Sequence, residues 1–222
     1  MKKGLTELVF ILDRSGSMAG LESDTIGGFN GMLKKQKKEE GEAVVTTVLF
    51  DDQYELLHDR IVIDGIAPMT EREYYVRGCT ALLDAVGKTI GKIDRVQKHT
   101  AEELKAEKVI FVITTDGLEN ASREYSYEQL RKMIEQKKQA GWEFLFLGAN
   151  MDAVSEAAKF GIAGERAVTY QNDSQGVELN YLAVSQFLSQ ARCCSAPQGA
   201  QWKEQIEEDV KKRGNRRRRR NQ

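Results

Sequence analysis

Three short stretches of the 222-residue chain carry side chains suited to hold a hard metal ion. The first, residues 13–17, reads DRSGS and directly follows an apolar run; the last, residues 114–117, reads TTDG and follows another. Between them, a threonine stands just before a predicted helix. Together the stretches offer two carboxylates and three hydroxyls. The candidate ligands are Asp13, Ser15, Ser17, Thr80 and Asp116.

This donor set favours Mg²⁺ or Mn²⁺. The two aspartates would offset the charge of a divalent ion, and all-oxygen ligands are those that magnesium and manganese take in proteins. Magnesium takes an octahedral shell and usually keeps several waters. Five protein oxygens at most therefore leave a position for an outside ligand. Zinc is disfavoured because no cluster of histidines or cysteines accompanies the stretches.

Apolar runs alternate with amphipathic stretches, which predicts an α/β fold: a doubly wound, mostly parallel, Rossmann-like sheet with helices on both faces. A turn at residues 51–53 makes the third strand an antiparallel edge strand. The predicted strands span residues 8–12, 44–50, 54–63, 109–113, 144–147 and 167–170. Predicted helices lie within residues 21–40, 82–93, 126–141, 152–161 and 177–188, the third opening with a capping box of Ser126 and Gln129.

Both candidate aspartates follow predicted strands. In open parallel sheets, ligands bind beyond the carboxyl ends of the strands, where neighbouring connections diverge. The three stretches are therefore expected to converge at one edge of the sheet. A plainer interpretation is that Asp13 and Ser17 cap the first helix and that Thr80 caps a later one.

Asp13, Ser15 and Ser17, followed by Thr80 and then Asp116-Gly117, resemble the metal-ion-dependent adhesion site of von Willebrand factor A-type (vWA) domains. Roughly residues 5–190 match the alternation of strands and helices in such a domain. The resemblance implies a protein-interaction module, whose metal completes its shell with a carboxylate from a partner protein. It also implies that residues at positions 80 and 116 can exchange direct and water-mediated roles. Cys79 departs from the glycine that is frequent there.

Composition divides the chain at residue 192. Hydrophobic residues make up 41% of the sequence, enough for one domain over residues 1–192, and residues 193–222 form a C-terminal extension. The net charge of −1 does not indicate a class of binding partner. Residues 211–222, however, contain eight basic side chains and no acidic one. We expect this end to be a disordered tail that binds polyanions, nucleic acid among them. Its basic residues are Lys211, Lys212, Arg213, Arg216, Arg217, Arg218, Arg219 and Arg220.

The apolar runs are too short for a secretory signal or a membrane span. Cys79, Cys193 and Cys194 do not resemble a disulfide framework, and free thiols suit a reducing compartment. These features predict a stand-alone domain in the cytoplasm. Asp51 and Asp52 are interpreted as turn residues, and His58 and His99 as solvent-facing.

Two other classes of function compete with an interaction module. An aspartate after the first strand suits a phosphoryl-accepting nucleophile, but phosphatases of the haloacid-dehalogenase type need a second aspartate where this chain has Ser15. No Ser-His-Asp or Cys-His arrangement stands out, and Glu119 is the one candidate base near Asp116. We therefore predict that the chain is not an enzyme. The other alternative is a nucleic-acid-associated factor anchored by its arginine tail.

Overall fold

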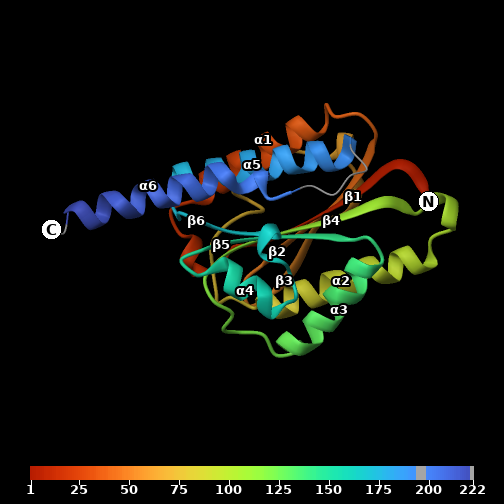
Figure 1. Ribbon diagram of the computed structural model, residues 1–222. Coiled ribbons are helices and arrows are strands. Elements are labelled where there is room, and N and C mark those ends of the chain that lie inside the picture. The colour runs from red at the N-terminus through yellow and green to blue at the C-terminus, as the bar shows by residue number, and fades with distance from the viewer. Residues whose placement is uncertain (194–198, 221–222) are drawn as a thin grey trace.

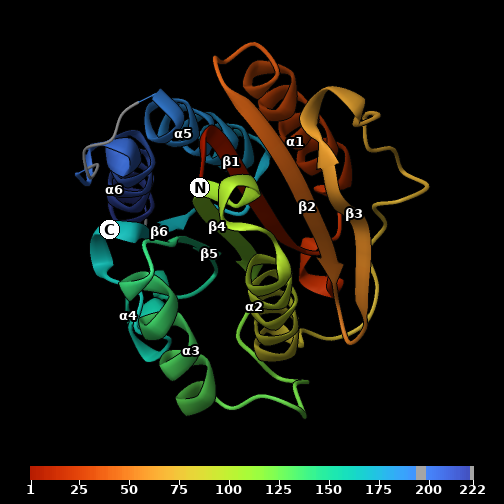
Figure 2. The same cartoon turned by 90° about the vertical axis from the view of Figure 1, so that its right-hand side faces the viewer.

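The computed structural model describes residues 1–193 and 199–220, the side chains of 215–220 excepted. Six strands form one sheet in the order β3-β2-β1-β4-β5-β6, as Figure 2 shows. Every neighbouring pair is parallel except β2 and β3, so β3 is the predicted antiparallel edge strand. The strands are β1 (Lys2–Asp13), β2 (Glu42–Phe50), β3 (Tyr54–Val62), β4 (Ala106–Asp116), β5 (Glu143–Ala149) and β6 (Ala167–Tyr170).

Helices cover both faces of the sheet (Figure 1). Helices α1, α5 and α6 lie on one face, and α2, α3 and α4 lie on the other. Their bounds are α1 (Glu22–Gln36), α2 (Leu82–His99), α3 (Tyr127–Gln139), α4 (Ala153–Lys159), α5 (Ser174–Cys193) and α6 (Glu204–Arg220). Short 3₁₀ helices span Gly16–Met18, Ile63–Gly65, Glu102–Leu104, Gly164–Arg166 and Gln201–Lys203.

Two hydrophobic cores result from the alternation of side chains along the strands. In β1, Leu8 and Phe10 join the core under α1 and α5. Val9 and Ile11, between and beyond them, join the core under α2 and α3. Because β1 is buried on both faces, it is an almost continuous apolar run. The doubly wound α/β fold and the capping box at the start of α3 are confirmed.

The C-terminal region differs from the prediction. A disordered tail was expected over residues 211–222, but α6 continues to Arg220, and residues 221–222 lie outside the described part. The buried side chains of Trp202 and Ile206 hold the start of this segment on the domain. Ion pairs one turn apart then support the helix, from Lys212 to Glu208 and from Arg213 to Asp209.

The histidine prediction holds for one of two residues. His99 is exposed at the end of α2, whereas His58 in β3 is buried, so its interpretation as solvent-facing is wrong. The register places His58 opposite Thr47 of β2, and its Nδ1 lies 3.0 Å from the Thr47 hydroxyl. Burial lowers the pKa of His58 below its usual value. An edge strand thus buries a polar side chain that pairs with its neighbour.

Candidate metal centre

Three hydroxyls predicted as ligands lie together at the carboxyl edge of the sheet. The Oγ of Ser15 lies 3.1 Å from that of Ser17 and accepts a 3.0 Å hydrogen bond from Thr80 Oγ1. Ser17 Oγ donates to the backbone carbonyl of Asp116, which joins the loop after β1 to the end of β4. The predicted convergence of the three stretches is therefore present.

Asp13 links the ends of β1 and β4 through neutral donors. Its Oδ1 accepts a 2.7 Å hydrogen bond from the backbone of Ser15. Its Oδ2 accepts from the Thr115 hydroxyl at 2.6 Å and from the backbone of Asp116 at 3.3 Å. The backbone carbonyl of Asp13 accepts a 2.6 Å bond from Tyr74. The carboxylate is thus fixed in place by neutral donors alone among the residues that the structure describes.

Asp116 is held by two residues that sequence reasoning missed. Its Oδ1 accepts a 2.5 Å hydrogen bond from Asn150, and its Oδ2 accepts one of 2.5 Å from Asn172. Asn150 directly follows β5, and Asn172 lies two residues beyond β6. Ligands bind beyond the carboxyl ends of parallel strands, and β5 and β6 are parallel strands like β1 and β4. The polar residues that follow them could therefore have been predicted from the sequence.

Capping does not explain the candidate ligands. The N-cap of α1 is Leu21 and that of α2 is Ala81, and neither makes a side-chain capping bond. Asp13, Ser17 and Thr80 therefore do not serve as the caps that the plainer interpretation assigned to them.

The carboxyl groups of Asp13 and Asp116 are both buried away from solvent. Asp13 is 1% exposed and Asp116 0%, and burial raises the pKa of each carboxyl above its usual value. Repulsion from Asp13 also raises the pKa of Asp116. Among the described residues, no lysine or arginine forms a salt bridge with either carboxylate. Because buried charges need pairing, these carboxylates suit a bound cation.

The sequence matches no family model and no curated protein. The fold, however, is similar to solved structures. Proximal thread matrix protein 1 of the mussel byssus is 17% identical, with a TM-score of 0.57 over 84% of this chain and 46% of that one. The von Willebrand factor domain of a type V pilus tip protein from Porphyromonas gingivalis is 11% identical, with a TM-score of 0.58 over 87% of this chain and 98% of that one.

The chain has the fold of von Willebrand factor A-type domains. The pilus adhesin SpaC of Lactobacillus rhamnosus GG is a further match, 11% identical with a TM-score of 0.62, over 86% of this chain and 30% of that one. The chain spans about half of the mussel protein, 46% of its length. Another structure of the mussel protein, with a TM-score of 0.54 and 14% identity, has a zinc-occupied adhesion-site motif.

The loop that carries Thr80 is tied to the loop after β4. The backbone of Thr80 donates a 2.9 Å bond to the Asn120 side chain, and its carbonyl accepts a 3.1 Å bond from the Asn120 backbone. Glu119 accepts from the backbones of Leu83 and Ser122 at 2.9 and 2.7 Å. The one candidate base is thus engaged in holding the loop. Cys79 is exposed, and its departure from glycine leaves Thr80 in place.

A buried ion-pair network adjoins the candidate metal centre. The fully buried Arg14 donates to Asp51 at 3.0 Å, and Arg77 donates to the same carboxylate oxygen at 2.6 Å. Although burial opposes it, hydrogen bonding from Arg77 holds the pKa of Asp51 below its usual value. Asp51 therefore does more than form a turn: it connects the end of β2 to the loops after β1 and before α2.

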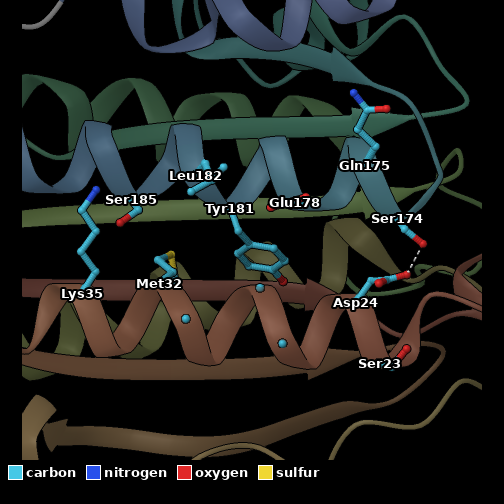
Figure 3. A pocket seen from close by; sticks show the side chains of 13 residues that line it. Ser23, Asp24, Met32, Lys35, Ser174, Gln175, Glu178, Tyr181, Leu182 and Ser185 are labelled. Atoms are coloured by element: carbon cyan, nitrogen blue, oxygen red, sulfur yellow. Dashed lines mark hydrogen bonds between the residues drawn. The ribbon is translucent and has the colours of Figure 1, made fainter.

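Two large clefts are among those on the described part of the domain. The larger, of about 620 Å³, opens between α1 and α5, with the Tyr181 ring against the glycine-rich face of α1 (Figure 3). None of the five candidate ligands lines it. The second, of about 550 Å³, is lined by Cys79 and Asn120, so it adjoins the loop of Thr80. Of these two clefts, the second is the one that adjoins a candidate ligand.

None of the described helices combines the length and the apolar character that crossing a bilayer needs. Within the described residues, no group of three or more His, Cys, Asp or Glu is arranged to hold a metal. The candidate centre, with two carboxylates and three hydroxyls, is of a different type. Cys194 lies outside the described residues, and Cys193 is exposed.

Proposed function

We propose that this A-type domain is a divalent-metal-dependent protein-interaction module. Mg²⁺, or Mn²⁺ in its place, would be held by Asp13, Ser15, Ser17, Thr80 and Asp116. The observation that carries the proposal is the pair of buried aspartates, which form no salt bridge with a described basic side chain and lie beside three clustered hydroxyls. A divalent ion would supply the positive charge that the described protein side chains do not.

The same donor set supports a role in recognition. The five oxygens do not complete an octahedral shell, so an outside oxygen ligand can bind the ion. An Asp or Glu carboxylate of a partner protein is the ligand that we propose, since it also adds the negative charge that a cation attracts. Similar structures support the idea: one is a pilus adhesin, and another has zinc in its adhesion-site motif.

We further propose that the chain is not an enzyme and that it acts in the cytoplasm. Glu119 is engaged by backbone amides, and neither His58 nor His99 is among the residues that contact the candidate ligands. The free cysteines among the described residues, Cys79 and Cys193, are compatible with a reducing compartment. Phosphatase turnover by the purified protein that disappears in Asp13→Asn would overturn the first of these proposals.

Capture from lysate tests the interaction. Immobilised domain loaded with Mg²⁺ should retain a partner that is released by chelator and by excess glutamate, and that is not retained by Asp13→Ala. Nuclease treatment should leave the retention unchanged. If the amount of partner retained changes neither with chelator nor with the Asp13→Ala substitution, binding does not depend on the metal.

The basic end of α6 favours a second candidate, association with nucleic acid. Two of its eight basic residues are already engaged, because Lys212 pairs with Glu208 and Arg213 pairs with Asp209 and Asp173. The sequence has six further positive charges in this end, at Lys211 and residues 216–220. If all six contacted phosphates of duplex DNA, the logarithmic salt slope of binding would be about −5.

Deletion of residues 211–222 tests this candidate. Full-length protein should shift RNA or DNA in a gel at low ionic strength, and the deleted protein should not, while its Mg²⁺ affinity stays the same. A full-length protein that shifts no nucleic acid would limit the basic end to contacts with acidic proteins or with solvent.

A further inference from the structure

Both carboxylate oxygens of Asp116 accept hydrogen bonds from side-chain amides that follow the ends of β5 and β6. We propose that Asn150 and Asn172 are positioning residues of the metal centre, which fix this carboxylate in the orientation that the ion requires. The inference rests on the proposed metal-binding function and extends it to two residues outside the predicted ligand set.

Strand register brings the two amides to Asp116. Asp116 pairs with Ala149 across β4 and β5, and Ala149 pairs with Tyr170 across β5 and β6. Asn150 and Asn172 therefore emerge at the same height of the sheet as the carboxylate. The carboxyl edge places one polar side chain per strand in spatial order: Asp13 from β1, Asp116 from β4, and then the two asparagines.

The backbone at Asn150 is shaped for this contact. Its φ is +54°, in the left-handed region that asparagine tolerates better than most residues. This conformation turns the chain sharply after β5 and lets the short amide reach Asp116 Oδ1 at 2.5 Å.

Asn172 connects both metal-binding loops. Its Nδ2 lies 2.5 Å from Asp116 Oδ2 and 3.4 Å from the backbone carbonyl of Ser17. One amide thus spans the loop after β1 and the end of β4. A displacement of Asn172 would alter the distance between two of the candidate ligands.

The chemistry of the contacts is that of an outer shell around a metal. Each carboxylate oxygen has two lone pairs, so an amide donor on one leaves the other for an ion or its water. Two such donors restrict rotation of the carboxylate and offset the repulsion between Asp116 and Asp13. Groups that orient metal ligands in this way typically contribute about 10–100-fold to metal affinity.

The test uses substitutions matched to the local backbone. Asn150→Gly removes the amide but keeps the left-handed conformation without strain, and it is combined with Asn172→Ala. Asn30→Ala is the control, because the Asn30 side chain ties α1 to the backbone of Met69 through two 2.8 Å bonds away from the candidate ligands. Mn²⁺ affinity is measured by calorimetry and by the paramagnetic resonance signal of the free ion.

The double variant should bind Mn²⁺ at least tenfold more weakly, while Asn30→Ala stays within twofold of the unaltered protein. Urea unfolding in the presence of chelator should give the double variant and Asn30→Ala the same midpoint, so that the loss of Mn²⁺ affinity reports on the centre and not on the stability of the fold. A double variant that binds Mn²⁺ as tightly as the unaltered protein, or a loss of affinity no larger than that of Asn30→Ala, overturns the positioning role.

The two proposals fail in different ways. If Asp13→Ala also leaves Mn²⁺ affinity unchanged, the metal centre itself is wrongly assigned. If Asp13→Ala abolishes binding and the asparagine substitutions do nothing, the metal centre stands and the positioning role alone is refuted.

Discussion

Strand β1 contains two buried carboxylates, Glu7 midway along it and Asp13 at its carboxyl end. Among the described residues, only Glu7 has a basic partner. Glu7 is 0% exposed and accepts from Arg60 at 2.8 Å and from Gln97 at 2.5 Å. Asp13, equally buried, accepts only from hydroxyl and backbone donors among the described residues. Burial is therefore common to both carboxylates, and the lack of a basic partner among the described residues is what distinguishes Asp13 at the candidate metal centre.

The comparison implies that Glu7 serves the stability of the fold and that Asp13 serves a ligand. The charge of a buried carboxylate that pairs with an arginine is already balanced within the protein. A buried acid that lies near another, without a basic side chain, raises the energy of the metal-free state until a cation enters. Substitutions at the two positions should therefore affect different measurements.

The largest effect is expected for Asp13→Ala. Because one of only two carboxylates at the centre is removed, calorimetric titration of metal-free protein with Mg²⁺ or Mn²⁺ should pass from one site to none. The fold should survive, since removal of one of two close carboxylates relieves their repulsion in the metal-free protein. Unchanged titration in this variant would contradict the assignment of Asp13 as a ligand.

Metal should stabilise the unaltered protein and not the Asp13→Ala variant. At a concentration one hundred times Kd, the free energy of unfolding should rise by about 2.7 kcal/mol, because the ion binds the folded state alone. Urea unfolding with Mg²⁺ and with chelator measures the increment. In Glu7→Gln, the metal should raise the free energy of unfolding by the same amount as in the unaltered protein. A smaller rise would mean that Glu7, like Asp13, contributes to metal binding.

Arg60→Ala should destabilise the fold and leave metal affinity unchanged. Loss of Arg60 leaves Glu7 without its basic partner; the cost should be about 2 kcal/mol, below the roughly 3–5 kcal/mol of fully buried pairs, because Arg60 is partly exposed. Arg131→Ala, which breaks an exposed pair with Glu135, is the control and should cost about 0.5 kcal/mol or less. Equal losses in both variants, measured by urea unfolding, would place Glu7 among ordinary surface carboxylates.

The smallest expected effect is a pH dependence that belongs to Glu7. Burial, opposed by Arg60, raises the pKa of Glu7 above its usual value of 4.5. The folded state therefore binds this proton more readily than the unfolded chain does, so the stabilisation is complete below pH 4.5 and is lost as pH rises through the folded value. Glu7→Gln should lack this component when urea unfolding is compared across that range. A pH profile identical to that of the unaltered protein would exclude it.

Sequence reasoning succeeded where a short pattern reports a property of the whole sheet. Apolar runs ending in Asp13 and Asp116 indicated parallel strands with polar side chains at their carboxyl ends, and parallel strands bring those ends to one edge. The structure brings together Asp13, Ser15, Ser17, Thr80 and Asp116 as expected. The antiparallel position of β3 followed from a turn too short for a crossover.

Sequence reasoning was wrong where the burial or the structure of a residue depends on contacts with residues distant in the sequence. Nothing local to His58 indicates burial, because Thr47 meets it only in the paired strands. Basic residues 211–220 were expected to be disordered from composition, which does not include the packing of Trp202 and Ile206 that anchors α6.

The sequence by itself determined the class of fold and the five candidate ligands, since periodicity and strand ends are local properties of the chain. The tertiary structure alone decided which charges are paired and which are not. Glu7 and Asp51 are acids in the sequence like Asp13, and only the arrangement of Arg60, Arg14 and Arg77 around them removes them from consideration as ligands. Strand register likewise decided that Asn150 and Asn172 meet Asp116, because a contact between strands depends on alignment that no single stretch of sequence contains.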